Sequence, residues 1–170
     1  SSQHFSMAQR SCGASAIAGF GRGLIKGCTV DAEITMITIN PEVYCEEYLG
    51  GVLSNGFADV ENCTVKLRGY TSVRGYVHNG GLVGLDDVNP KDKQYAGFVR
   101  GCSVDAVISF FEDVADRRAY CKAYVGEIQN PDLLVVGNKT ENFESRESKD
   151  FTQMLLPDMD ADPTYDAVVT

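Results

Sequence analysis

The six cysteines of this chain recur at nearly constant intervals. They occupy positions 12, 28, 45, 63, 102 and 121, so the gaps between them are 16, 17, 18, 39 and 19 residues. The gap of 39 residues is close to twice an ordinary gap. A fixed spacing of this kind is the signature of a repeat protein, in which each repeat is one supersecondary unit. The 170 residues are therefore expected to form one stack of similar units.

Alternate cysteines have matching surroundings. The strings LIKGCTVDAEI, DVENCTVKLRG and FVRGCSVDAVI superpose on Cys28, Cys63 and Cys102. Each string carries an apolar residue three positions before the cysteine and continues with Thr or Ser and then Val. From Cys28 to Ile34 apolar and polar residues alternate with a period of two, as in a half-buried β-strand. These segments are predicted to be equivalent strands.

A second pattern lies between these strands. The apolar-rich strings AIAG, YLGG, GLVG and AYVG end at Gly19, Gly51, Gly84 and Gly126. Two of them belong to a longer motif, Y-C-x-x-Y-[LV]-G, which occurs at 44–50 and again at 120–126. A unit of about 33–42 residues therefore occurs nearly four times. We expect the two copies of the motif to occupy the same corner of the fold, two units apart.

Short strands at a fixed period predict an all-β solenoid, in which a coil buries its inner face only by stacking on the next coil. The predicted solenoid covers 1–137, with irregular coils, and the polar segment 138–170 is predicted to be a C-terminal cap, tail or linker. Cysteine suits an internal ladder because it is small and apolar. The predicted ladder residues are Cys28, Cys45, Cys63, Cys102 and Cys121. The four glycines that end the apolar strings are expected where the backbone has a positive φ or where coils pack closely.

The charge of the chain argues against two classes of partner. Asp and Glu number 24 against 15 Lys and Arg, for a net charge of −9. A nucleic-acid binder needs a basic face, and docking on anionic lipid needs basic clusters. No run approaches the roughly 18–20 apolar residues of a membrane-spanning helix, so no membrane insertion is expected. The chain begins SSQHFSM without an initiator methionine, which predicts a processed chain or a segment of a larger parent protein with other domains.

The string GGLVG at 80–84 resembles the GLUG repeat of large bacterial surface proteins. That repeat reads roughly G-G-L-V-G-x-N-x-G-x-I-x-N-C, and Gly23, Ile25 and Gly27 stand before Cys28 at the matching offsets. The similarity extends, with insertions, over about 12–137. It implies a right-handed parallel β-helix on a bacterial secreted or cell-surface protein, where it serves as a spacer or adhesin segment. The implied partner is a host or cell-wall glycan or protein, and the family brings no catalytic residues.

Four tyrosines recur with the cysteines. An outward-facing row of them would offer a stacked aromatic strip for sugar rings, because tyrosine combines apolar area with a polar handle. The alternative is that they fill the core or a corner, which the repeat alone already explains. The candidate ligand-binding residues are Tyr44, Tyr48, Tyr120 and Tyr124.

The cysteines are expected to be free buried thiols. The chain has no C-x-x-C motif, and its two histidines, His4 and His78, lie far apart, so a zinc site with standard spacing is unsupported. Cysteines stacked one coil apart would have Cα atoms about 5 Å from one another, within disulfide range. In-register stacking nevertheless points the side chains in parallel, which is unfavourable for the S–S torsion.

The C-terminal string DMDADPTYDAVVT resembles a calcium loop. Its candidate metal ligands are Asp158, Asp160, Asp162 and Asp166, hard oxygen donors that suit a hard cation. Pro163 stands where the tight turn of such a loop favours Gly, and Val169 stands where a bidentate Glu is needed. The alternative is an acidic linker, and calcium is the single cofactor considered.

No recognised catalytic motif occurs in the chain, so we expect a protein that is not an enzyme. Asp31 and Asp105 stand three residues after their cysteines, with Lys66 at the equivalent place between them. The three side chains are expected in one outward-facing row. The alternative function is a β-helical carbohydrate-active enzyme, a polysaccharide lyase or hydrolase, which would need paired carboxylates in a groove.

Overall fold

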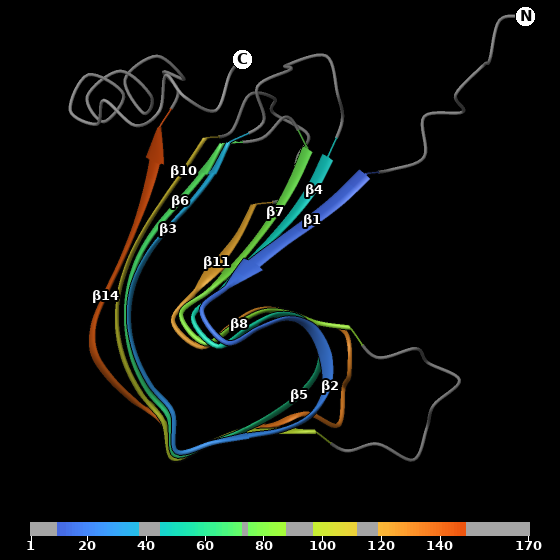
Figure 1. Cartoon of the computed structure of the whole chain (residues 1–170), viewed down its shortest axis with the longest axis vertical. Helices are drawn as coiled ribbons and strands as arrows, with labels where there is room; N and C mark the ends of the chain where they lie inside the picture. Colours follow the sequence, from blue (N-terminus) through green and yellow to red (C-terminus); the bar gives the residue numbers. More distant parts are fainter. Residues whose placement is uncertain (1–9, 38–44, 73–74, 88–96, 112–118, 149–170) are drawn as a thin grey trace, which may run out of the picture.

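The computed structural model describes residues 10–37, 45–72, 75–87, 97–111 and 119–148. All regular structure in these ranges is β-strand, and the strands form three parallel sheets (Figure 1). The first sheet contains the strands β1 (Arg10–Ser15), β4 (Cys45–Gly50), β7 (Gly75–Gly80) and β11 (Ala119–Lys122). The second sheet contains β2 (Ala18–Lys26), β5 (Leu53–Glu61), β8 (Val83–Asp86), β9 (Phe98–Arg100), β12 (Val125–Ile128) and β13 (Leu134–Val136). The third sheet contains β3 (Thr29–Ile37), β6 (Thr64–Ser72), β10 (Ser103–Phe111) and β14 (Lys139–Ser148).

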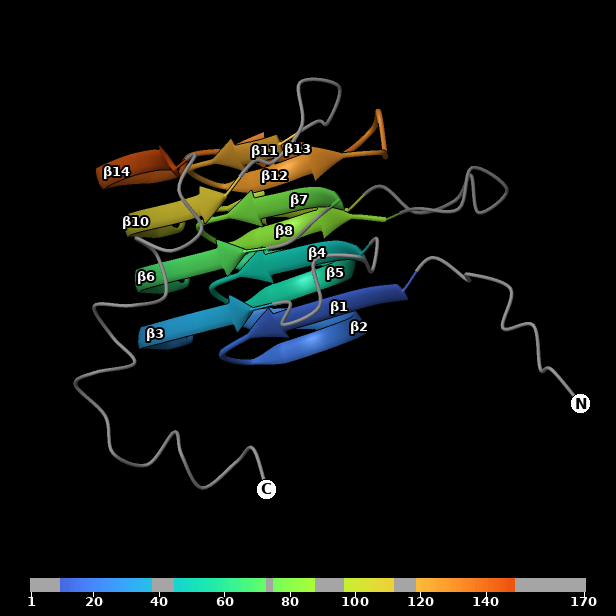
Figure 2. The ribbon, with the colours of Figure 1, turned by 90° about the horizontal axis from the view of Figure 1, so that it is seen from above.

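The chain visits the three sheets in turn and then returns to the first sheet one level further along the axis. The first coil is β1–β3, the second β4–β6, the third β7–β10 and the last β11–β14. With the first coil nearest the viewer, the chain runs clockwise and recedes, which makes the solenoid right-handed (Figures 1 and 2). The predicted all-β, right-handed parallel solenoid is confirmed.

The core lies between the third sheet and the inner faces of the other two. In β6 and β10 side chains alternate strictly between buried and more exposed, as the sequence predicts for half-buried strands. Side-chain size alternates between coils as well: Leu67, which is fully buried, stacks between Ala32 and Ala106. Two residues further along the strand, Gly69 stands between two isoleucines, and Leu49 of the first sheet packs over it. Each level therefore fills the space that its neighbours leave, at the density typical of protein interiors.

A residue with positive φ forms the corner between the second and third sheets in every coil. The four corner residues are Gly27, Asn62, Gly101 and Gly137, with φ between 54° and 66°. Asn62 is the one residue of this set with a side chain, and asparagine tolerates the left-handed region better than most residues do. The corner fixes where each strand of the third sheet begins.

The third sheet continues beyond the predicted end of the repeat. β14 pairs with β10 along its whole length, with a β-bulge opposite Val104 and Asp105. The stack therefore reaches Ser148, a correction to the predicted boundary at 137. The remainder of the predicted cap or linker, 149–170, lies outside the described residues.

The two copies of the Y-C-x-x-Y motif do not occupy the same corner, and this expectation is wrong. Cys45 pairs with Gly75, whereas Cys121 pairs with Asn79, four residues further along β7. Gly50 and Gly80 share one row at the bend after the first sheet, where a Cβ on either would collide with the carbonyl oxygen of the residue three positions later. Lys122, and not Gly126 of the second motif, occupies this row in the last coil.

The same bend corrects the alignment of the four predicted glycines. Gly84 and Gly126 lie in one row with Gly19, and a Cβ on Gly84 or Gly126 would collide with the backbone of the neighbouring level. Ser54, not Gly51, occupies this row in the second coil. Gly51 instead lies against Gly81, where its Cβ would also collide with backbone. The four glycines therefore belong to two rows of close backbone packing, which are three residues apart along the chain, and not to one row as the sequence indicates.

Candidate functional site

His78 stands at the centre of an aromatic ladder on the outer face of the first sheet. β7 places it in register with Tyr48 of β4 and Tyr120 of β11. The imidazole centroid lies 5.1 Å from the Tyr48 ring and 5.3 Å from the Tyr120 ring, with interplanar angles of 25° and 8°. In-register parallel strands are about 4.8 Å apart, so equivalent rings stack face to face along the solenoid axis.

Two carboxylates face the two ring nitrogens of His78. Nε2 lies 2.9 Å from Glu46 Oε1 on β4, a hydrogen bond, and Nδ1 lies 2.7 Å from Glu127 Oε2 on β12. The second contact is an ion pair by distance and lacks the alignment of a hydrogen bond. The imidazole is 3% exposed. Each ring nitrogen of His78 therefore lies within ion-pair distance of a carboxylate oxygen from a neighbouring coil.

Tyr48 of this ladder is a protonated phenol at neutral pH. Burial raises the pKa of Tyr48, and the neighbouring Glu46 carboxylate raises it further. Tyr48 is 7% exposed, and one face of its ring is covered by His78. The ladder therefore ties the second, third and last coils together through stacked rings and two charged contacts.

The structure brings together two of the four tyrosines proposed as a sugar-binding strip. Tyr48 and Tyr120 lie in the ladder, with His78 between them. Tyr124 lies in the bend after β11, where its hydroxyl accepts a hydrogen bond from Thr140 Oγ1 at 2.8 Å. Tyr44 is outside the described residues. Sequence reasoning missed His78, and the available signal was that it stands where the cysteine rhythm skips one interval.

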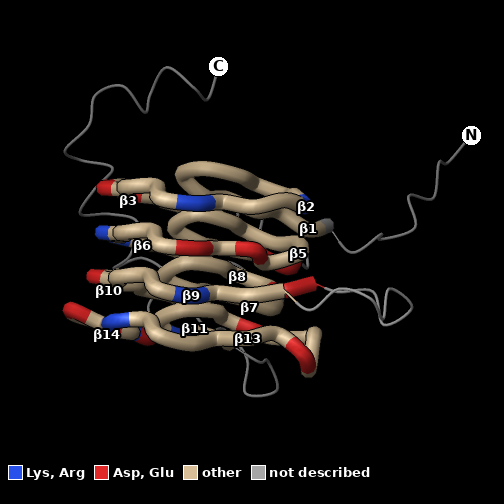
Figure 3. Tube along the Cα trace, turned by 90° about the horizontal axis from the view of Figure 1, so that it is seen from below, with Lys and Arg blue, Asp and Glu red and all other residues tan. Residues whose placement is uncertain are grey.

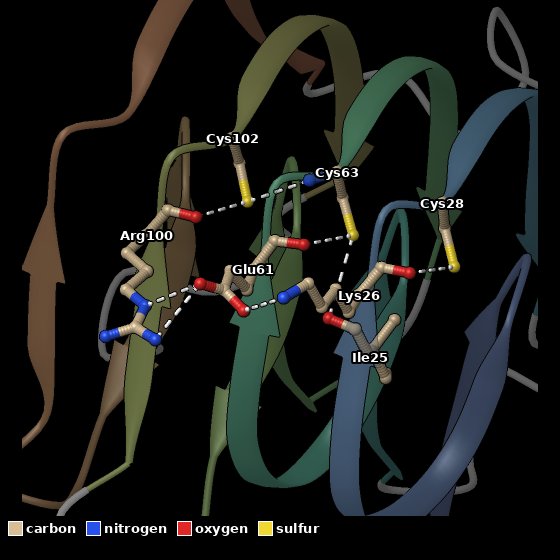
Figure 4. A network of polar contacts seen from close by, with 7 residues as sticks. All are labelled: Ile25, Lys26, Cys28, Glu61, Cys63, Arg100 and Cys102. Atoms are coloured by element: carbon tan, nitrogen blue, oxygen red, sulfur yellow. Dashed lines mark hydrogen bonds and ion pairs between the residues drawn. The ribbon is translucent and has the colours of Figure 1, made fainter.

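A second ladder runs along the corner between the second and third sheets (Figure 4). Cys28, Cys63 and Cys102 occupy successive levels, and each thiol donates to the carbonyl oxygen two residues before it. The backbone N–H of Cys63 also donates to Cys102 Sγ at 3.4 Å. Burial raises the pKa of Cys63 to about 11 and also raises that of Cys102. These thiols are protonated at neutral pH and are poor nucleophiles.

Asn138 takes the cysteine position in the last coil. Its Oδ1 accepts the backbone N–H of Cys102, as Cys102 Sγ accepts that of Cys63. Its Nδ2 donates to the carbonyl oxygen of Val99, as the Cys63 thiol donates to that of Ile25. The amide therefore repeats both contacts of the thiol. Cys28, Cys63, Cys102 and Cys121 are free thiols.

Charged side chains form a third set of contacts between coils. Glu61 binds Lys26 of the first coil at 3.1 Å and Arg100 of the third coil at 3.0 Å, so charge alternates along this corner (Figure 3). These contacts lower the pKa of the Glu61 carboxyl. The carboxylate is thereby kept ionised between two cations.

The row of Asp31, Lys66 and Asp105 has a similar arrangement. These residues face outward at successive levels of the third sheet, as the sequence predicts. Lys66 lies 3.3 Å from Asp31, and Arg68 lies 3.2 Å from Asp105. Hydrogen bonds from Arg68 and Asn142 lower the pKa of Asp105, which opposes a role as general acid.

Asp86 is the fully buried carboxyl of the second sheet. It accepts the backbone N–H groups of Ala58 at 3.2 Å and Asn130 at 3.3 Å. Burial raises its pKa to about 6, against the opposing effect of these two hydrogen bonds. Because both donors are backbone groups of the second sheet and the turn after it, the arrangement is that of a structural clasp.

In the described ranges, no group of three or more His, Cys, Asp or Glu side chains could hold a metal ion. The predicted calcium ligands, Asp158, Asp160, Asp162 and Asp166, lie outside those ranges. In the same part of the chain, no helix is long and apolar enough to cross a membrane.

The fold and the ladders define a class: a right-handed parallel β-solenoid whose coils are tied by side chains that repeat at each level. The chain matches no family model, no curated protein and no solved structure. The resemblance to the GLUG repeat therefore stays a prediction.

Proposed function

We propose that this chain is a non-catalytic spacer segment of a bacterial cell-surface or secreted protein. The observation that carries the proposal is that ionisable side chains make contacts between neighbouring coils. Glu61 binds cations on two neighbouring coils, and His78 faces carboxylates on two others. Side chains that elsewhere bind ligands or transfer protons are engaged here in contacts between levels of the same solenoid. The extracellular location rests on the GLUG-like string at 80–84.

A spacer needs axial stiffness, and the ladders supply it. Each ladder contact crosses from one coil to the next, parallel to the direction in which the solenoid would be extended. A solenoid without such contacts relies on backbone pairing and the core alone, because each repeat touches only its neighbours. The spacer role is favoured over the adhesin role because the stacked face of Tyr48 is turned toward His78 and not toward solvent.

Two assays on the full chain test the proposal. In the first, single-molecule pulling on the two ends should show resistance by the solenoid as a unit, and the resistance should fall in a His78→Phe variant. In the second, the chain should give no saturable signal on a broad glycan array, with or without calcium, and should release no sugar from uronate polymers. Saturable glycan binding would favour the adhesin role, and sugar release would establish the alternative enzyme.

A further inference from the structure

Large exposed apolar side chains lie at the two ends of the second sheet and in the bend that precedes it. At the first coil Ile17, Phe20 and Leu24 are 48%, 73% and 57% exposed. At the last coil Ile128, Leu134 and Val136 are 43%, 53% and 49% exposed. Terminal repeats of solenoids normally carry a polar outer face, because an open apolar end recruits a further repeat. Both ends of the second sheet lack that face.

The two ends match each other in register. Leu24, Asp59, Phe98 and Leu134 occupy the same position in successive coils. One further step along the axis would place Leu24 of a second copy against Leu134. By the same step Gly21, which has open space where a Cβ would stand, would receive Ile128. Leu24 and Leu134 therefore meet each other and Ile128 meets free space, whereas the same step places Phe20 against Glu127 and Val136 against Lys26.

The corner beside the second sheet continues in the same way. Gly27 of the first coil and Gly137 of the last coil both have φ of 66°, so the corner has one shape at the two ends. A further step would bring Cys28 of a second copy to Asn138. Its thiol would then accept the Asn138 backbone N–H, as Cys102 Sγ accepts that of Cys63. The joint between copies would repeat contacts that already join coils within the chain.

The shape of the coil selects the direction of stacking. The outline in Figure 1 is irregular, with a sharp bend between the first and second sheets and one long arm formed by the third sheet. Such an outline superposes on itself by a shift along the axis and not by turning one copy over. We propose that copies of this chain stack head to tail, with the first coil of one copy on the last coil of the next. This interface goes beyond the proposed spacer function and does not depend on it.

The third sheet limits the strength of the joint. Glu33 of the first coil and Glu144 of the last coil share one register position, so stacking would place like charges side by side. The bulge in β14 also leaves Glu141 as an extra residue on the outer strand. Charged residues and bulges are devices that weaken edge pairing. The association is therefore expected to be weak at low salt and stronger at high salt, which screens the repulsion.

Sedimentation velocity of the full chain over a concentration series, at low and high salt, tests the proposal. A head-to-tail interface does not close, so it generates a series of longer species. The weight-average sedimentation coefficient should rise with concentration without a plateau at the dimer, and should rise further at high salt. One species at every concentration and salt, or a plateau at the dimer, would overturn the proposal.

Two end variants sharpen the test, since both substituted leucines are more than half exposed and the fold should survive. Leu24→Asp blocks only the first coil and Leu134→Asp blocks only the last coil. Each variant alone should stay monomeric, with association weakened more than about tenfold by the desolvation of the new charge. An equimolar mixture should form dimers and nothing longer, because one intact end remains on each variant. Thr64→Asp, which adds the same charge at an exposed site in the second coil, should associate like the unaltered chain.

The pairing of these variants leaves no ambiguous result. If Leu134→Asp alone still dimerises while Leu24→Asp does not, two first coils meet face to face and the head-to-tail arrangement is wrong. If the mixture stays monomeric, the two ends do not bind each other. Circular dichroism of each variant confirms that the β-fold is retained before either conclusion is drawn.

Discussion

The second and third sheets treat their outer strands differently. The second sheet ends in exposed apolar residues at both levels, Leu24 on β2 and Leu134 on β13. The third sheet ends in the charged strand β14, KTENFESRES, which contains a bulge. Both sheets have the same inner levels of buried aliphatic residues. In this solenoid, the features that prevent further strand pairing, charge and a bulge, occur at the outer strand of the third sheet. The second sheet is where we propose that a second copy of the chain stacks.

The largest expected effect on the free energy of unfolding comes from truncating a buried side chain in an inner coil of the third sheet, compared with an exposed side chain in the first coil of the second sheet. Leu67→Ala should lower the free energy of unfolding by about 2–5 kcal/mol, because Ala32 and Ala106 on either side cannot fill the cavity. Leu24→Ala, the matched control, should change it by less than about 0.5 kcal/mol, because the side chain is exposed. Chemical denaturation of both variants makes the measurement. Equal losses would mean that the first coil is as tightly packed as the inner coils.

The second prediction concerns the first sheet, where residues of different types, tyrosine and histidine, stack between coils. His78→Phe keeps a ring between Tyr48 and Tyr120 but removes the ring nitrogens that face Glu46 and Glu127. We expect a loss of about 1–3 kcal/mol in the free energy of unfolding, as for the loss of partners to partly buried charged groups. Adding Glu46→Gln and Glu127→Gln to this variant should recover part of the loss. No recovery would show that stacking alone, and not charge, makes this ladder.

Asp86 should give the second sheet a pH dependence of its own. Its folded-state pKa of about 6 lies above the ordinary value of 3.8, so the native state binds the proton more tightly than the unfolded chain does. Its contribution to stability is present below the ordinary pKa and is lost as pH rises through about 6. The expected decline is roughly 3 kcal/mol, since one pKa unit corresponds to about 1.4 kcal/mol.

Asp86→Asn isolates this effect. Burial also raises the pKa of Asp59, so the unaltered chain contains a second group that shifts in the same direction. The difference between the two unfolding curves across the pH series therefore reports Asp86 alone. A decline of the same size in the variant would show that Asp86 does not titrate in this window.

The smallest effect tests the corner between the two sheets. Asn138→Ala should cost about 1 kcal/mol, because the Cys102 backbone N–H and the Val99 carbonyl oxygen each lose a partner. Asn138→Cys should cost less, since Cys63 and Cys102 already make the same two kinds of contact. Thermal unfolding of the pair gives the comparison. A larger loss for the cysteine variant would show that the last coil requires the amide.

The sequence was sufficient to predict the fold because the corner residues repeat in kind. Cys28, Cys63 and Cys102 occupy equivalent positions in successive coils. In the strands that follow them, buried and more exposed side chains alternate as predicted. The sequence predicts the fourth unit only as far as residue 137, because Asn138 replaces cysteine, although the pair Gly137-Asn138 matches the pair Gly101-Cys102. A search for the left-handed corner residue, and not for the cysteine, would have found it.

The first sheet was not predictable in the same way, because its levels are unlike one another. Tyr48, His78 and Tyr120 share a position but not a residue type, so no periodic signal marks the ladder. The repeated Y-C-x-x-Y motif predicts a different register, in which Gly126 would be level with Gly50, whereas the structure places Lys122 in that row. Collision of backbone atoms is a property of the folded bend, which the local sequence does not reveal.

Hydrogen exchange of the unaltered chain and of His78→Phe tests most directly the claim that ionisable and aromatic residues tie the coils together. Exchange rates report how cooperatively neighbouring strands open. The account predicts that the variant loses protection together in β4, β7, β11 and β12, the strands that contribute to the His78 ladder. Loss of protection confined to β7, with the neighbouring coils unchanged, would contradict it.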